Sequence, residues 1–208
     1  MIKMKYYKEL PNGYKEVYSI DAGNTKTGLI LNLIGLPIMI VMFIILMVIK
    51  SLVCGKINFD LSDGETSLVL FILCIVMILY IIIHELTHGL FYNFFTKEKL
   101  KFGLKLTCAY CGVPTIYMKK IPMIITALAP FVIYSLIGVI LMIVVPYNVI
   151  FLAIDILFSA HVAGCVGDIY ISFLLIKYPK ETLVNDTGAK QTFYILDRKE
   201  DELCESLN

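Results

Sequence analysis

The sequence contains little charge and no tryptophan. Only 17% of its 208 residues are charged, whereas 59% are hydrophobic. A soluble globular domain carries about 25% charged residues, so this composition excludes that class and indicates an integral membrane protein. The net charge of +1 gives no support for a nucleic-acid partner, because proteins that bind nucleic acids carry strongly basic surfaces.

The sequence also lacks the cysteine spacing of a secreted disulfide scaffold. Cys74 and Cys165 lie inside apolar runs, and we expect the six cysteines to be mostly free thiols. Cys108 and Cys111 form an isolated C-x-x-C, with no second pair that would complete a zinc ribbon. The N-terminal segment has no apolar stretch or cleavage site of a signal peptide, so we expect the mature chain to begin at Met1.

Four long apolar runs dominate the sequence. A helix needs about 20 mostly apolar residues to cross a membrane, and runs of this kind cover residues 29–49, 68–95, 122–145 and 149–176. We therefore predict an all-α membrane protein with about four transmembrane helices, which forms a single domain over residues 1–208.

Lysine and arginine alternate between the segments that join these runs. Five precede the first run, two lie between the first and second, six between the second and third, none between the third and fourth, and five follow the fourth. Short segments rich in these residues stay in the cytoplasm. We therefore expect a multi-pass protein of the cell membrane, with both termini, the loop over residues 96–121 and a tail over residues 177–208 in the cytoplasm.

The loop over residues 96–121 contains a pattern typical of a β-strand. Leu100, Phe102, Leu104 and Leu106 alternate with polar or small residues, which is a period of two. The turn-forming sequence "CAYCGVPT" follows at residues 108–115. We predict a short cytoplasmic β-hairpin or re-entrant segment at this point of the chain.

The second apolar run contains "HELTHG" at residues 84–89. Ionisable groups inside a membrane are costly and are rare without a function. On a helix, His84 and His88 share one face with about 6 Å between their stems, so both imidazoles can bind one zinc ion. Glu85 can take a proton from water that the metal activates. The motif predicts Zn²⁺ as cofactor, His84 and His88 as ligands, and Glu85 as the catalytic base.

A third ligand is expected from the fourth apolar run, because a catalytic zinc site has three protein ligands and one open position. The second and fourth runs cross in the same direction, so residues can be counted from their cytoplasmic ends at about 1.5 Å each. Asp168 lies at the level of His88, whereas His161 lies about 6 Å deeper than His84. We expect Asp168 to be the third ligand, with His161 as the alternative ligand or as a partner of the ligands.

These motifs resemble those of a bacterial family of membrane proteins described as putative zincin peptidases, related in layout to the site-2 protease class of intramembrane metalloproteases. The similarity covers "ELPNGYKEVYSID", "HELTHG", "ALAPF" and "GCVGDIY". Site-2 proteases take their third ligand from a Leu-Asp-Gly motif, whereas Gly167 and Ile169 flank Asp168 in this chain. The resemblance implies a metallopeptidase-like domain over residues 1–208.

The residues favour hydrolysis of a peptide bond within the membrane or near its cytoplasmic face. The substrate would be a membrane protein or a peptide. Two alternatives use the same residues: a divalent-cation or proton transporter, and a non-catalytic membrane protein that binds a client. Glu85→Gln separates a peptidase from a transporter, because hydrolysis depends on the general base whereas ion flux does not.

Overall fold

The computed structural model describes residues 5–56 and 63–197. The chain divides into two compact units, of which one contains residues 1–29, 85–129 and 168–208 and the other contains residues 30–84 and 130–167. We call them the sheet unit and the helical unit. The prediction of a single domain stays a prediction.

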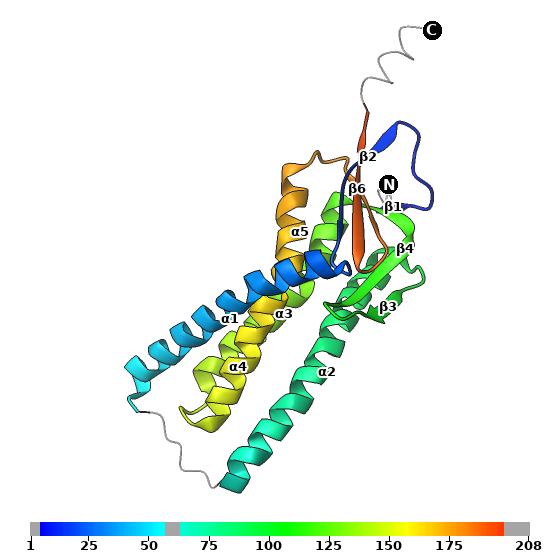
Figure 1. The fold of residues 1–208 in the computed structure, drawn as a ribbon. Coiled ribbons are helices and arrows are strands. Elements are labelled where there is room, and N and C mark those ends of the chain that lie inside the picture. Colours follow the sequence, from blue (N-terminus) through cyan, green and yellow to red (C-terminus); the bar gives the residue numbers. More distant parts are fainter. Residues whose placement is uncertain (1–4, 57–62, 198–208) are drawn as a thin grey trace, which may run out of the picture. The chain divides into compact units, whose positions relative to one another are not determined.

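The elements (Figure 1) are β1 (Tyr6–Tyr7), β2 (Tyr14–Asp21), α1 (Thr25–Cys54), α2 (Asp63–Thr96), β3 (Lys101–Leu104), β4 (Ala109–Lys119), α3 (Lys120–Val144), α4 (Val149–Gly164), α5 (Val166–Lys177), β5 (Leu183–Asp186) and β6 (Lys190–Leu196).

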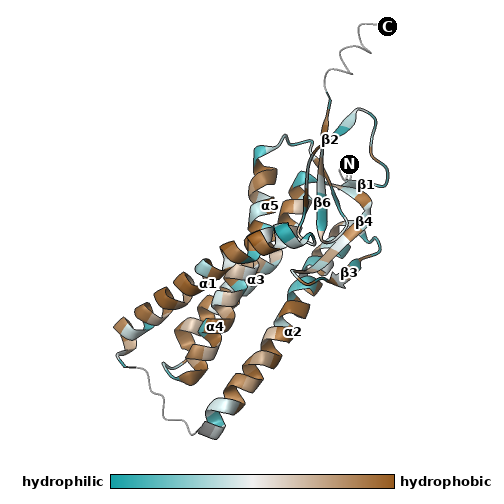
Figure 2. Cartoon of the chain, in the orientation of Figure 1, coloured by the Kyte–Doolittle hydropathy of each residue, from teal (hydrophilic) through white to brown (hydrophobic). Residues whose placement is uncertain are grey.

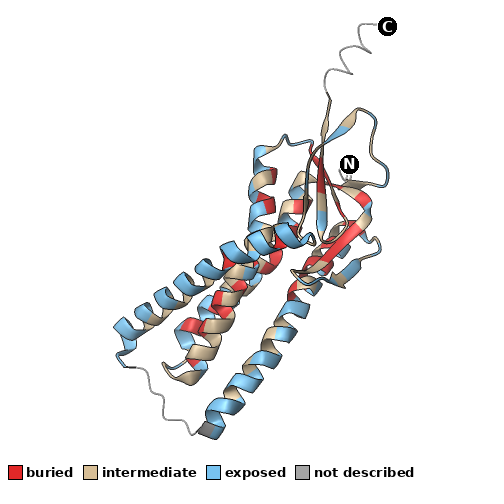
Figure 3. Ribbon diagram, viewed as in Figure 1, coloured by how far each residue is buried: buried red, intermediate tan, exposed pale blue. Residues whose placement is uncertain are grey.

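Within the part of the chain that the structure describes, four helical segments are long and apolar enough to cross a membrane, in agreement with the predicted spans. They cover Thr25–Cys54, Gly64–Thr96, Lys120–Val144 and Val149–Lys177. Figure 2 shows hydrophobic residues along these helices, whereas hydrophilic residues are frequent on the strands and turns. Most large apolar side chains of α1 and of the first two thirds of α2 are exposed (Figure 3). Such surfaces are consistent with a multi-pass membrane protein, in which lipid covers them.

Close contacts at glycines hold the helical unit together. A Cβ atom added to Gly138 of α3 would lie 2.2 Å from the ring of Phe158 in α4. A Cβ atom added to Gly35 of α1 would lie 3.1 Å from the carbonyl oxygen of Ala163 in α4. Small residues permit this close approach between membrane helices. Both α1 and α3 therefore pack directly against α4.

The fourth predicted span, residues 149–176, is divided into α4 and α5. The division lies at Cys165, which has φ −78° and ψ 1° and caps the end of α4. Gly164 and Gly167 flank this point, and glycine has a low helix propensity. The depth comparison of His161 with Asp168 assumed one straight helix, and the break lies between these two residues.

The sheet unit shows that the all-α prediction is wrong. Its six strands form an antiparallel sheet in the order β1-β4-β5-β6-β2, and β3 also pairs with β4. The β3–β4 pairing, from Lys101 opposite Gly112 to Leu104 opposite Ala109, lies where the hairpin was predicted. The hairpin is thus one part of a larger sheet, whose other strands come from segments near both ends of the chain.

The segment predicted as a tail supplies two of these strands. β5 and β6 occupy residues 183–196, and the side chains of Leu183, Val184 and Phe193 are fully buried. Val184 and Phe193 belong to one core cluster with Tyr92 of α2 and Leu175 of α5. Residues 198–208 of the predicted tail lie outside the described residues. The strands after α5 are therefore part of the core of the sheet unit.

Candidate metal centre

α2 carries the three residues of the predicted zinc motif. His84 and His88 lie one turn apart on this continuous helix, which places them on the same face. Only 8% of His84 and 7% of His88 is exposed, and buried imidazoles require polar partners. The boundary between the two units falls between His84 and Glu85. Tyr80, which bonds His84, belongs to the helical unit, whereas Thr126 and Asp168, which contact His88, belong to the sheet unit.

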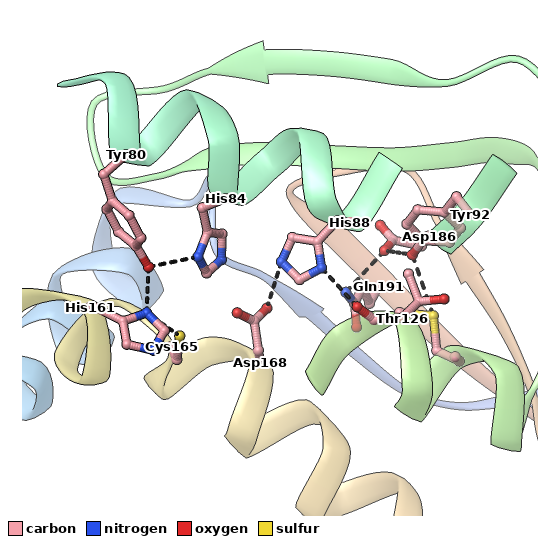
Figure 4. Close-up of polar contacts among 11 residues, drawn as sticks. Tyr80, His84, His88, Tyr92, Thr126, His161, Cys165, Asp168, Asp186 and Gln191 are labelled. Atoms are coloured by element: carbon pink, nitrogen blue, oxygen red, sulfur yellow. Dashed lines mark hydrogen bonds and ion pairs between the residues drawn. The ribbon is translucent and has the colours of Figure 1, made fainter. Parts of the chain in front are cut away.

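His88 has polar partners on both ring nitrogens. Its Nδ1 lies 2.9 Å from the carbonyl oxygen of Thr126 in α3. Because a carbonyl oxygen only accepts, Nδ1 donates the hydrogen bond and the lone pair of the neutral ring lies on Nε2. Nε2 lies 3.5 Å from Oδ1 of Asp168 (Figure 4). This is the ring state of a metal-binding histidine whose second nitrogen is held by a backbone carbonyl.

The separation of His88 and Asp168 fits two ligands of one metal ion. Zinc binds nitrogen and oxygen ligands at about 2.0–2.2 Å, so two ligands of a tetrahedral ion lie roughly 3.3–3.5 Å apart. The observed Nε2 to Oδ1 distance is 3.5 Å. Asp168 reaches this position because it lies in the first turn of α5, directly after the break at Cys165. Two imidazoles and a carboxylate are a donor set that zinc accepts.

Glu85 lies near the first residues of β4. Burial and, to a smaller extent, the charge of Glu85 raise the pKa of Cys111 to about 12. One turn after Glu85, a Cβ atom added to Gly89 would lie 2.9 Å from Phe102 and 3.4 Å from the sulfur of Cys111. Gly89 therefore lets the β3–β4 hairpin pack against α2 beside the motif.

His84 belongs to a set of hydrogen-bonded side chains in the helical unit. The Tyr80 hydroxyl lies 3.0 Å from Nδ1 of His84 and also bonds Nδ1 of His161 in α4. Nε2 of His161 lies 3.1 Å from the hydroxyl of Ser135 in α3. The sulfur of Cys165 lies 3.6 Å from Nδ1 of His161. Figure 4 shows the Tyr80 hydroxyl between the two imidazoles.

Both residues predicted as the third ligand, Asp168 and His161, lie beside a motif histidine. Asp168 lies beside His88. Ligand atoms of His84, His161 and Cys165 all lie within 4.8 Å of one another, and this group could hold a metal ion. The ligand roles themselves stay predictions. Sequence reasoning missed Tyr80, although its position one turn before His84 on an apolar helix is a signal that a search for polar residues in the spans would have found.

A buried carboxyl group connects α2 to the sheet. Asp186 of β5 is 4% exposed and accepts hydrogen bonds from the Tyr92 hydroxyl, from the amide of Gly188 at 2.8 Å and from Nε2 of Gln191 at 3.1 Å. Burial raises the pKa of Asp186 to about 7. Because Tyr92 lies one turn after His88, this cluster holds the end of α2 against β5 and β6. Sequence reasoning missed this cluster too.

Comparison with known families gives one result for this chain. A family model described as a putative zincin peptidase matches residues 76–183. The matched segment includes His84, Glu85, His88 and Asp168, together with the β3–β4 hairpin. Comparisons with curated proteins and with solved structures find no match.

Proposed function

The chain belongs to the family described as putative zincin peptidases, and on this basis we propose that it is a membrane-embedded zinc metallopeptidase that hydrolyses a peptide bond near the cytoplasmic face of the membrane. The membership confirms the family resemblance over residues 76–183, which include "HELTHG", "ALAPF" and "GCVGDIY" but not "ELPNGYKEVYSID". The relation to site-2 proteases stays a prediction. The observation that carries the proposal is the Asp168 carboxylate 3.5 Å from Nε2 of His88, whose Nδ1 donates to Thr126.

We assign His84, His88 and Asp168 as the ligands of Zn²⁺. When bound, zinc polarises a substrate carbonyl and makes water nucleophilic at neutral pH. Thr126 supports this role, since its carbonyl keeps the proton of His88 on Nδ1. His161 is the alternative third ligand. Tyr80 and Ser135 bond its two ring nitrogens, which favours Asp168 as the ligand and His161 as a supporting residue.

Glu85 is the proposed general base. It directly follows His84 on α2 and lies on the side of the helix near β4, where its charge acts on Cys111. A carboxylate in this place takes a proton from the attacking water and then gives it to the leaving amine. Loss of such a group typically costs a factor of about 10² to 10⁴ in rate.

The β3–β4 hairpin is the proposed contact for the substrate. A peptide must be extended for its carbonyl to reach the metal, and an extended segment can add to the edge of a sheet through backbone hydrogen bonds. β3 pairs with β4 through one edge, and the hairpin packs against α2 at Gly89. An extended segment on the other edge of β3 would therefore extend the hairpin that packs against α2 one turn after Glu85.

Metal analysis of purified variants in detergent tests the ligand set. We expect one zinc ion per chain in the wild type and a loss of zinc in His88→Ala and in Asp168→Ala. Asp155→Asn is the matched control, because this buried aspartate of α4 bonds Ser159 and is not an assigned ligand. Full zinc occupancy in either ligand variant would refute the site.

Glu85→Gln tests the reaction class. A peptidase is expected to keep its zinc and to lose cleavage of a membrane-protein substrate by about 10² to 10⁴. A transporter that uses the same ligands would keep metal flux in this variant, and a non-catalytic client-binding protein would keep its phenotype in His84→Ala. Either of these results would replace the peptidase proposal.

A further inference from the structure

Four polar side chains form a continuous hydrogen-bonded chain inside the helical unit. It runs from His84 on α2 to Tyr80 on the same helix, then to His161 on α4 and Ser135 on α3. His84 and His161 are 8% and 2% exposed. Three helices therefore contribute to a chain that ends on the first histidine of the motif.

The donors and acceptors of this chain allow two consistent arrangements. A hydroxyl group has one proton, so Tyr80 can donate to only one of the two Nδ1 atoms that it contacts, and it must accept from the other. In the first arrangement His84 Nδ1 donates to Tyr80, Tyr80 donates to His161 Nδ1, and His161 Nε2 donates to Ser135. In the second arrangement every one of these bonds runs the other way.

The two arrangements differ in which ring nitrogen of His84 carries the proton, and therefore in whether Nε2 can bind a metal. In the first, the proton of His84 is on Nδ1 and the lone pair is on Nε2. In the second, Nε2 of His84 carries the proton and cannot bind a metal. The first arrangement gives His84 the same ring state that the Thr126 carbonyl gives His88.

We propose that Tyr80 is a positioning residue for the metal site, which holds His84 in the Nδ1-protonated state and is itself oriented by His161 and Ser135. This inference rests on the proposed function, because it takes His84 as a zinc ligand. Partners of this kind, which hold the second nitrogen of a metal-binding histidine, contribute about 10- to 100-fold to metal affinity. The inference also assigns a use to His161 that does not require it to touch the metal.

The same side chains suggest a competing explanation, in which His84, His161 and Cys165 bind a metal directly. Their ligand atoms are close enough, all within 4.8 Å of one another. However, the Tyr80 hydroxyl bonds Nδ1 of both imidazoles, and a metal bound to these two atoms would take the lone pairs that the hydrogen bonds need. The observed bonds therefore favour the positioning role, and the test below separates the two.

The test measures zinc affinity of the full-length protein in detergent by competition with a chromophoric chelator. We expect Tyr80→Phe to bind zinc about 10- to 100-fold more weakly than the wild type. Tyr134→Phe is the matched control: its ring centroid lies 5.7 Å from that of Tyr80 and 6.1 Å from that of His161, and its hydroxyl lies 3.4 Å from the carbonyl oxygen of Ile83. We expect the affinity of this control to be unchanged.

Two further measurements distinguish positioning from general damage. The metal-free Tyr80→Phe protein should melt within a few degrees of the metal-free wild type, so that the loss concerns the metal only. His161→Phe should weaken zinc binding, and the double variant with Tyr80→Phe should bind about as well as the weaker single variant, because residues in one hydrogen-bonded chain are not additive.

Each outcome has one interpretation. A wild type that binds no zinc refutes the proposed function, and the inference with it. If the wild type binds zinc and Tyr80→Phe binds it with equal affinity, the inference is refuted but the proposed function is not. With Co²⁺ in place of zinc, a thiolate-to-cobalt absorption band that disappears in Cys165→Ser would show direct binding by Cys165, and would also refute the inference. Absence of that band, together with weak binding by Tyr80→Phe, supports it.

Discussion

His88 acquires its chemistry from two residues that are distant in the sequence. The backbone carbonyl of Thr126 accepts a hydrogen bond from Nδ1, and Asp168 lies 3.5 Å from Nε2. A carbonyl group cannot be removed by side-chain substitution, which makes this orientation robust to mutation at Thr126. Asp168, in contrast, contacts His88 through its side chain, which a substitution can remove, and the proposed metal site depends on this side chain.

Burial shifts the ionisation of two side chains of the sheet unit, Cys111 and Asp186. In the sheet unit, burial raises the pKa of Cys111 to about 12 and that of Asp186 to about 7. The thiol of Cys111 is therefore protonated at neutral pH and acts as an apolar packing group. Asp186 changes its charge close to neutral pH, and the shift of its pKa makes stability depend on pH.

We expect the stability of the metal-free protein to fall as the pH rises from about 4 to about 7. Over this range the folded protein keeps a proton on Asp186, whose pKa is about 7, whereas the unfolded chain has lost it at an ordinary pKa of about 3.9. The folded state then binds more protons, so the free energy of unfolding decreases with pH. Asp186→Asn should flatten this dependence. Thermal midpoints measured over this pH range, in detergent with a chelator, would test the dependence. Glu16→Gln, at an exposed position, is the control. If the midpoint of Asp186→Asn fell with pH as steeply as that of the wild type, the prediction would be wrong.

At the scale of elements, the last strand of the chain stabilises the sheet unit. β6 pairs with β2 from Tyr14 opposite Leu196 to Asp21 opposite Lys190 and contributes Phe193 to the core. The two strands are separated by most of the sequence, so their pairing has no local signal. The tail was predicted from its charged residues, and the short apolar stretch around Phe193 was too brief to indicate a buried strand.

We expect Phe193→Ala to destabilise the protein by about 3–5 kcal/mol, the usual cost of truncating a buried phenylalanine. Phe193 is fully buried, whereas Lys190 on the same strand is exposed. Lys190→Ala is therefore the matched control, with an expected change within about 0.5 kcal/mol. Chemical denaturation in detergent would measure both. Equal stability of the two variants would show that β6 is not part of the core.

The division of the fourth span into α4 and α5 is a second effect at this scale. His161 and Cys165 stay in contact at the end of α4, whereas Asp168 lies in the first turn of α5. Gly164 and Gly167 were visible in the sequence, but glycine is tolerated in membrane helices. Its presence alone therefore did not predict a break.

At the scale of the whole molecule, the four apolar helices of residues 5–56 and 63–197 are long enough to cross a membrane. Four crossings would place both termini on the same side. The distribution of lysine and arginine predicts that this side is the cytoplasm. We expect epitope tags at both ends to be inaccessible to antibodies in intact cells and accessible after lysis. A tag inserted after Gly55, in the loop that follows α1, should be accessible in intact cells. The opposite pattern would reverse the predicted orientation and place the hairpin outside.

The sequence by itself determined the four apolar helices and the one-turn spacing of His84 and His88. Both follow from local properties, namely the length of an apolar run and the geometry of a helix. The tertiary structure decided which residues surround these histidines: Thr126 and Asp168 at His88, and Tyr80 with His161 at His84. It also decided that segments near both ends of the chain form one sheet. These contacts join residues far apart in the sequence, and they depend on how buried groups satisfy their hydrogen bonds, which no local pattern records.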